Sequence, residues 1–247
     1  SDVCSSDLPA DFALFYVAIG WPVLPLWWPV GAGLSVTLPP DREPGDDGDE
    51  VYTAGVCACP RGAACTSPAK HPIAALAPRG SHDATTDEAT VRAWWERFPD
   101  ANVGITLPGL VALDVDPRHG GDRALVGLVE QDDYLGETVH ALTGGGGDHY
   151  LFRAPDASCG AVRGELGAGL DVKHGGGGYL VAPPSRHASG GRYSWARDAA
   201  PWDIEPAELP LWLLYRVCPS CPRSLVVEAQ EQRSAAPVAL PRLGDRA

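Results

Sequence analysis

The sequence contains no methionine and only two lysines, Lys70 and Lys173, so nearly all of its positive charge is arginine. We therefore expect that Ser1 is not a natural start and that residues 1–7 lie outside the fold. Long uninterrupted hydrophobic runs are also missing, since Gly20 and three prolines break the longest one, residues 12–30. Such a run is too broken to span a membrane, and no charged segment precedes it as in a secretory signal. We therefore expect a cytoplasmic protein with no membrane partner.

Cysteine content and charge set further limits. The seven cysteines are an odd number in a chain without a secretory signal, which argues against a disulfide framework and leaves metal binding or burial as their use. The formal net charge of -13 disfavours a nucleic-acid protein, but much of the acid lies in residues 41–50, which we expect to be a solvated loop. The 45% hydrophobic content is that of a globular protein with a core.

The hydrophobic spacing predicts a mixed fold of helices and short strands. Helical periodicity occurs over residues 9–19, 87–98, 122–130 and 206–217, with a capping box of Thr85 and Glu88 before the second segment. Short apolar runs predict strands over residues 21–26, 102–107, 110–115, 138–143, 149–153, 169–173 and 179–182. We therefore expect an α+β fold with a mainly antiparallel sheet. One domain would span residues 8–217, and a polar, disordered linker or tail would span 218–247.

Two aspartates end the apolar run Leu110-Val-Ala-Leu-Asp-Val-Asp. If this run is a strand, Asp114 and Asp116 point to the same face, because they are two residues apart. Neighbouring carboxylates repel one another unless a cation lies between them. A buried strand has no structural need to end in paired acids, so the pair indicates a metal site. A surface turn or helix cap is the structural alternative.

A run of four glycines, Gly144–Gly147, precedes His149 between two expected strands. A tight hairpin needs only one or two glycines, so backbone N–H groups brought close to phosphate oxygens explain the run better. Gly145, Gly146, Gly147 and His149 are accordingly candidate nucleotide-binding residues. A histidine at the start of a strand is otherwise more often structural.

A third acid lies in the segment Gly169-Leu-Asp-Val-Lys-His, where Asp171 and Lys173 share a strand face. The carboxylate could join a metal site and the ammonium could meet a triphosphate, whereas the structural alternative is a surface ion pair. That alternative does not explain the second glycine run and the Pro183-Pro184 turn that follow. Arg186 and His187, directly after this turn, are further candidates for nucleotide or template contact.

Cys57, Cys59, Cys65 and His71 supply three thiolates and an imidazole, which suffice for a closed tetrahedral zinc site. A group of free cysteines is the alternative. The fourth ligand is open between His71 and another group. A second pair, Cys218-x-x-Cys221, could supply half of another site.

These blocks, in this order, resemble the bifunctional primase-polymerase (prim-pol) domain of the archaeo-eukaryotic primase superfamily, over about residues 10–195. Asp114 and Asp116 match the acidic first motif of that family, His149 the second motif and Asp171 the third. The second motif is often Ser-x-His, whereas a glycine stands at the serine position of this chain.

The resemblance implies an archaeo-eukaryotic primase-like fold. It would have an N-terminal α/β part, a zinc-binding insert at about residues 55–72 and an RNA-recognition-like catalytic core at about residues 100–196. The implied activity is the template-directed joining of (d)NTPs on a single-stranded DNA template and primer. The implied setting is replication of a phage, plasmid or other mobile element, with a replicative helicase as a partner.

The acids imply a two-metal mechanism in which Mg²⁺ or Mn²⁺ is held by Asp114, Asp116 and Asp171. His149 and Lys173 would hold the phosphates, and Zn²⁺ would be structural. One alternative is a DxD nucleotide-sugar glycosyltransferase, which does not predict the ordered second and third motifs. The other is a noncatalytic DNA-binding module of replication initiation.

Overall fold

The computed structural model describes residues 8–31, 33–35, 51–53, 55–132, 134–155 and 161–221. Residues 1–7, the acidic stretch 41–50 and residues 222–247 of the expected tail lie outside this set, so what was predicted for them stays a prediction. The helices within the set are α1 (Pro9–Ala18), α2 (Glu88–Arg97), α3 (Gly121–Asp132) and α4 (Leu211–Val217). Short 3₁₀ turns are η1 (Gly62–Ala64), η2 (Gly80–Asp83) and η3 (Pro117–His119).

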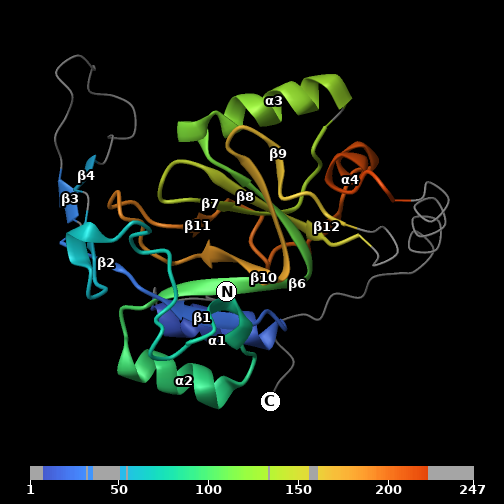
Figure 1. The fold of residues 1–247 in the computed structure, drawn as a ribbon. Helices are drawn as coiled ribbons and strands as arrows, with labels where there is room; N and C mark the ends of the chain where they lie inside the picture. Colours follow the sequence, from blue (N-terminus) through green and yellow to red (C-terminus); the bar gives the residue numbers. More distant parts are fainter. Residues whose placement is uncertain are drawn as a thin grey trace.

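One eight-stranded sheet forms the centre of the molecule, with helices on both sides of it (Figure 1). Its strands are β1 (Val23–Leu26), β6 (Asn102–Val115), β7 (Val139–Leu142), β8 (Asp148–Arg153), β9 (Glu165–Gly167), β10 (Leu170–Ala182), β11 (Ser194–Trp195) and β12 (Ala207–Glu208). Their order is β11-β7-β8-β6-β10-β9, with β1 beside β6 and β12 beside β8. Among these described strands only β12 and β8 pair in parallel. The predicted mixed, mainly antiparallel fold is thus confirmed.

Two small ribbons lie apart from the sheet. They are formed by β2 (Pro29–Val30) with β5 (Val56–Cys57) and by β3 (Gly33–Ser35) with β4 (Val51–Thr53). The ribbon of β2 and β5 leads directly into the cysteine cluster, because Cys57 ends β5.

Strands β6 and β10 are each longer than the sequence indicated. The predicted strands 102–107 and 110–115 are one strand, as are 169–173 and 179–182. The two strands run antiparallel throughout, and the register shifts between His174 and Gly175 and again before Tyr179. Unpaired residues therefore lie on both strands around the pair of Gly175 and Leu107. The pairing of β6 with β10 continues beyond the glycines that were expected to end it.

Alternating side chains of β6 enter two hydrophobic cores on opposite faces of the sheet. Leu110 and Ala112 belong to the core that α1 and α2 cover, whereas Val111, Leu113 and Val115 belong to the core of α4. This period of two is that of a strand buried on both faces. Asp114, two residues after Ala112, lies on the same face as Ala112, where the first core gives way to a cavity.

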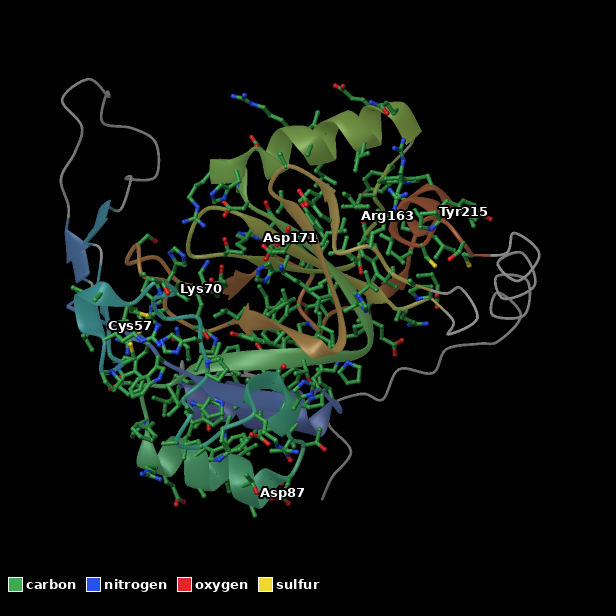
Figure 2. The ribbon with its side chains drawn as sticks, viewed as in Figure 1. Cys57, Lys70, Asp87, Arg163, Asp171 and Tyr215 are labelled. Carbon is green, nitrogen blue, oxygen red and sulfur yellow. The ribbon has the colours of Figure 1, made fainter. Side chains whose placement is uncertain are left out.

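The start of α2 differs from the predicted capping box. The side chain of Asp87, labelled in Figure 2, accepts a hydrogen bond from Thr90 N–H at 2.8 Å and is the N-cap. Thr85 instead accepts from Asp87 N–H at 3.0 Å and lies two residues too early to be the N-cap of the helix. An aspartate three residues before a free N–H satisfies the same geometry as the serine or threonine of a capping box.

The last predicted helix, residues 206–217, begins later than expected. Its first residues form the short strand β12, which pairs with β8, and α4 begins only at Leu211. Pro210 is the residue before the helix. The helical spacing was correct for 211–217, but the pairing with β8 is a long-range contact that local spacing does not reveal.

Candidate active site

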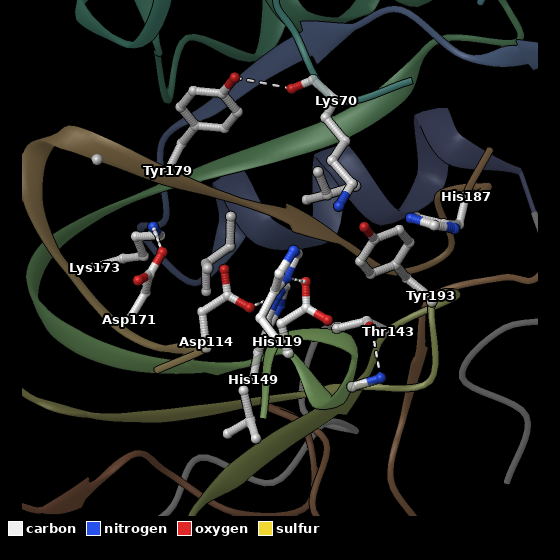
Figure 3. Close-up of a pocket in the computed structure, with 18 of the residues that line it drawn as sticks. Lys70, Asp114, His119, Thr143, His149, Asp171, Lys173, Tyr179, His187 and Tyr193 are labelled. Carbon is white, nitrogen blue, oxygen red and sulfur yellow. Dashed lines mark hydrogen bonds and ion pairs between the residues drawn. The ribbon is translucent and has the colours of Figure 1, made fainter. Parts of the chain in front are cut away.

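Three polar residues form a row across the middle of the sheet. Asp114 on β6 lies directly opposite Asp171 on β10 and directly opposite His149 on β8. Directly opposed residues of neighbouring strands point to the same face, so these side chains converge (Figure 3). Asp116 follows β6 by one residue and is the N-cap of η3, where its side chain accepts from Arg118 N–H at 3.0 Å.

The converging side chains open into a cavity of about 790 Å³. The motif residues that line it are Asp114, Asp116, Gly145, Gly147, His149, Asp171, Lys173 and His187. Lining residues that the sequence did not assign to the site include Lys70, Arg118, His119, Thr143 and Tyr179. Tyr193 also lines this space. The cavity therefore gathers segments that are up to about half the chain apart.

Each carboxylate of the site has a basic side chain beside it. Asp116 is bound by Arg118 through two hydrogen bonds of 2.9 and 2.8 Å, and His119 Nδ1 lies 2.9 Å from its Oδ2. Lys173 Nζ donates to Asp171 Oδ2 at 2.6 Å. Figure 3 shows this pair at the edge of the cavity.

The third acid has an imidazole as its neighbour. His149 Nε2 lies 3.4 Å from Asp114 Oδ1, and the His149 ring is buried. Each acid of the site thus has a basic side chain as its neighbour, and these side chains of the protein itself offset the mutual repulsion expected from the acids.

These neighbours lower the pKa values of two acids. The hydrogen bonds of Arg118 hold the pKa of Asp116 far below its usual value, with His119 adding to the effect. Burial alone would raise the pKa of Asp114, but the hydrogen bond and charge of His149, with the charge of Lys173, lower it overall. Both groups are therefore carboxylates at neutral pH, which is the form that binds a divalent cation.

The glycine run forms a tight turn before β8. Thr143 N–H donates to Gly147 O, Gly146 N–H donates to Thr143 O, and Gly147 N–H donates to Thr143 Oγ1. A Cβ on Gly147 would lie 2.2 Å from the carbonyl oxygen of Val115. Close packing thus demands glycine here, independently of any contact with phosphate. Gly145 and Gly147 line the cavity, whereas Gly146 is not among its lining residues.

His187 lies beside this turn. Its Nδ1 is 3.1 Å from Ser189 N and 2.8 Å from Ser189 Oγ. A Cβ built on Gly145 would lie 3.3 Å from His187 Nε2, so this ring nitrogen lies at the glycine turn. Burial lowers the pKa of His187 to about 4, so the ring is neutral at physiological pH.

Arg186 is directed away from the cavity. Its guanidinium pairs with Asp100 at 3.0 Å, and its backbone N–H donates to Asn102 Oδ1 at 2.9 Å. It is not a lining residue. Arg186 was predicted to contact nucleotide or template, like the adjacent His187. The side chains of these two residues leave the backbone in different directions, and only His187 lines the cavity.

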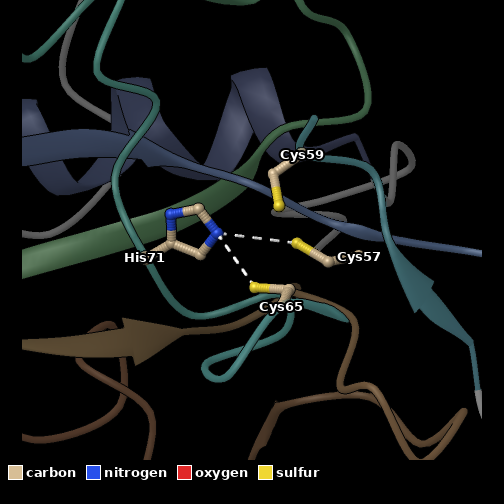
Figure 4. A group of neighbouring side chains, drawn as sticks. All are labelled: Cys57, Cys59, Cys65 and His71. Carbon is tan, nitrogen blue, oxygen red and sulfur yellow. Dashed lines mark hydrogen bonds between the residues drawn. The ribbon is translucent and has the colours of Figure 1, made fainter. Parts of the chain in front are cut away.

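The four side chains predicted to bind zinc lie together at the end of β5 (Figure 4). Their ligand atoms are all within 4.8 Å of one another, and His71 Nε2 is 3.6 Å from Cys57 Sγ and 3.4 Å from Cys65 Sγ. A tetrahedral zinc ion with bonds of about 2.0–2.3 Å separates its ligand atoms by roughly 3.5–3.8 Å. Cys57, Cys59 and Cys65 are free thiols, so this cluster could hold zinc with His71 as the fourth ligand.

The second cysteine pair does not resemble a metal site. Cys221 is disulfide-bonded, which removes it as a ligand and corrects the expectation that the cysteines serve only metal binding or burial. Cys218 is buried beside Leu213 and Val217 in the core of α4.

Comparisons with known proteins agree with the motifs. The family model described as "bifunctional DNA primase/polymerase, N-terminal" matches residues 13–212. No curated protein matches the chain. None of the helices in the described residues has both the length and the apolar character needed to cross a membrane. Since the family model covers most of the sequence and includes all three acidic positions, this chain belongs to the family of bifunctional DNA primase/polymerase N-terminal domains.

Proposed function

We propose that this chain is a DNA primase/polymerase that joins (d)NTPs on a single-stranded DNA template by a two-metal mechanism. The observation that carries the proposal is the convergence of Asp114, Asp116 and Asp171 on one cavity in a member of this family. A glycosyltransferase would not belong to this family, and a purely structural role would not require acids at the cavity wall.

The donor set suits hard divalent cations. Carboxylate oxygens on adjacent strands are the ligands that Mg²⁺ and Mn²⁺ prefer. Bound there, such ions lower the pKa of an attacking 3′-hydroxyl and neutralise charge on the leaving pyrophosphate. Asp114 is placed between the other two acids, since Asp171 opposes it across the ladder and Asp116 follows it by two residues.

The remaining lining residues are suited to hold the nucleotide. His187 places its Nε2 at the glycine turn, and Tyr193 keeps its phenol proton because burial raises its pKa. Lys173 and His149 lie beside acids, and binding of cations to those acids would free both groups for phosphate oxygens. Neutral and cationic hydrogen-bond donors that line one cavity can together bind the oxygens of a triphosphate.

The same proposal extends to domain organisation and partners. The catalytic domain would span residues 8–217 with an archaeo-eukaryotic primase-like fold, a structural zinc insert at about 55–72 and an RNA-recognition-like core at about 100–196. The family match and the Cys57–His71 cluster support this division. Single-stranded DNA, a primer and a replicative helicase would be the partners, in replication of a phage, plasmid or other mobile element.

Primer extension with Mn²⁺ and each nucleotide set tests the proposal. Asp114→Asn, Asp116→Asn and Asp171→Asn should each reduce incorporation at least about 100-fold, because lost charge stabilisation of this kind costs that much or more. Asp122→Asn, an exposed carboxylate on α3, is the matched control and should incorporate at the wild-type rate.

Two outcomes would contradict the proposal. If any of the three variants incorporated nucleotides at the wild-type rate, that acid would not hold a catalytic ion. If the wild-type chain bound DNA but incorporated nothing with either metal, a noncatalytic replication module would be the better description.

A further inference from the structure

Lys70 reaches the cavity from a part of the chain that is remote from the acidic motifs. It lies in the loop after η1, directly before His71 of the cysteine cluster, yet it lines the same cavity as Asp114. Figure 3 shows its side chain extending from that loop toward Tyr193, and in Figure 2 it lies between Cys57 and Asp171.

Lys70 differs from Arg118 and Lys173, which also line the cavity, in that its ammonium forms no ion pair with an acid among the described residues, although the charges of Asp114 and Asp116 act on it. Arg118 is bound to Asp116 and Lys173 is bound to Asp171. For Lys70, by contrast, no ion pair or hydrogen bond of the ammonium is found in the described part of the chain, although the residue is half-buried. Withdrawing an ammonium from water without a partner is unfavourable, so this position suits an anion brought by a ligand.

The backbone around Lys70 is held by several contacts. Tyr179 Oη donates to Lys70 O at 2.8 Å, and Asn102 Nδ2 donates to Ala69 O at 2.9 Å. Ala69 N–H donates to Cys57 Sγ at 3.5 Å, and Ala69 has the left-handed backbone angle φ 60°. A non-glycine residue in this conformation persists only when its surroundings determine it.

The cysteine cluster holds the backbone on both sides of Lys70. One of its members, Cys57, accepts from the residue before Lys70, and another, His71, is the residue after it. An ion that joins the four ligands would therefore fix both sides of Lys70. The cluster lies at the end of a small ribbon, β2 with β5, which by itself offers few contacts to hold a loop.

We propose that Lys70 binds the triphosphate tail of the incoming nucleotide, and that the Cys57–Cys59–Cys65–His71 cluster serves to position it. The inference rests on the proposed function for the identity of the ligand. A lysine is a compact point charge that binds phosphate without the bidentate geometry of arginine, and a flexible stem needs a fixed backbone to present it. Lys70 would contact the phosphates, and the cluster would act only through Lys70.

Nucleotide binding tests the first half of this proposal. Lys70→Met keeps the length of the stem and removes the charge, so folding should be unaffected. With a fluorescent dNTP and Ca²⁺ in place of a reactive metal, its affinity should fall about ten-fold or more, since one charged hydrogen bond is worth that much. Binding of the corresponding dNMP should change little. Arg61→Met, which removes an exposed cation from the same insert, is the control and should bind dNTP normally.

The role of the cluster in positioning Lys70 is tested by combining zinc removal with Lys70→Met in a double-mutant cycle. Stripping the cluster with a chelator, followed by restoring Ca²⁺, should weaken dNTP binding by wild-type protein and have no further effect on Lys70→Met. Tyr179→Phe, with zinc in place, removes the hydroxyl that holds Lys70 O and should show the same dependence on Lys70. This variant decides the matter if the stripped protein melts before binding can be measured.

Equal dNTP affinity of Lys70→Met and wild type would overturn the inference, and so would a cluster effect of equal size in both backgrounds. These results differ from failure of the proposed function, which would appear as absence of primer extension by the wild-type protein. A chain that polymerises but binds dNTP independently of Lys70 would refute this inference alone.

Discussion

The guanidinium of Arg118 binds both carboxylate oxygens of Asp116, with Nε donating to Oδ1 at 2.9 Å and Nη2 donating to Oδ2 at 2.8 Å. The two residues are separated only by Pro117, at the turn that follows β6. An aspartate expected to hold a metal ion is therefore already occupied by a cation of the protein. A divalent ion that uses Asp116 must displace this guanidinium, which would then be available for a phosphate group.

Arg118→Ala should therefore bind Mn²⁺ more tightly than the wild-type protein. The ion no longer competes with the guanidinium, and one positive charge near the site is lost, so both effects act in the same direction. The Arg118 side chain is 53% exposed, and the pair should contribute no more than about 1 kcal/mol to stability.

Titration of Mn²⁺ by electron paramagnetic resonance measures this change. Arg153→Ala is the control, because Arg153 pairs with Glu205 and Glu208 outside the cavity. Mn²⁺ affinity of Arg118→Ala equal to or below that of wild type would show that the ion pair does not compete with metal.

The stability of the protein should depend on pH through His187. Burial, with the charges of Lys70 and Arg118, lowers its pKa from 6.5 to about 4, while Asp116 opposes this shift. The unfolded chain therefore takes up a proton first as the pH falls. The contribution of His187 is fully present above about pH 6.5 and is lost between pH 6.5 and 4, by up to about 3 kcal/mol.

Urea unfolding of wild type and His187→Gln at several pH values between 7 and 4 checks this dependence. The free energy of unfolding should fall more steeply for wild type than for the variant across that window. Parallel curves would mean that the histidine has an ordinary pKa in the folded protein.

One zinc ion per chain should copurify with the protein. The ligand distances fit a tetrahedral ion, and burial lowers the pKa of His71, which keeps the imidazole in the neutral form that binds metal. Elemental analysis should find a single zinc in wild type, much less in Cys65→Ser, and the full amount in Cys218→Ala, whose cysteine lies in the core of α4. Protein prepared without chelators that contained no zinc would rule the site out.

Gly147→Ala should destabilise the protein by about 2 kcal/mol or more, since its Cβ would lie 2.2 Å from Val115 O and cannot be accommodated without a backbone shift. Gly127→Ala is the matched control. It lies within α3 with nothing within 4 Å of the new Cβ, so helix propensity should stabilise it by up to about 1 kcal/mol. Thermal melting compares the two. If Gly147→Ala left the melting temperature unchanged, close packing would not require the glycine, and contact with phosphate would be the remaining reason for it.

Local patterns were sufficient to predict several features from the sequence. The period of apolar residues predicted α1, which ends one residue earlier than expected. The spacing of Asp114 and Asp116 predicted that both face one side, and both line the cavity, although β6 ends at Val115 and Asp116 follows it. The cysteine cluster could also be predicted from the sequence, because Cys57, Cys59, Cys65 and His71 are close in sequence and need only a short loop to meet. Each of these features depends on neighbours within about fifteen residues.

Tertiary structure alone decided the rest. Asp171 meets Asp114 because β10 pairs with β6 in one register, and that register is set by burial of Leu113 and Val172 against α4, not by the acids. Lys70 lines the same cavity from a distant loop, and its carbonyl accepts a hydrogen bond from Tyr179, more than a hundred residues away. Contacts of this kind depend on which strands pair and how the chain closes over them, and no local periodicity encodes that choice.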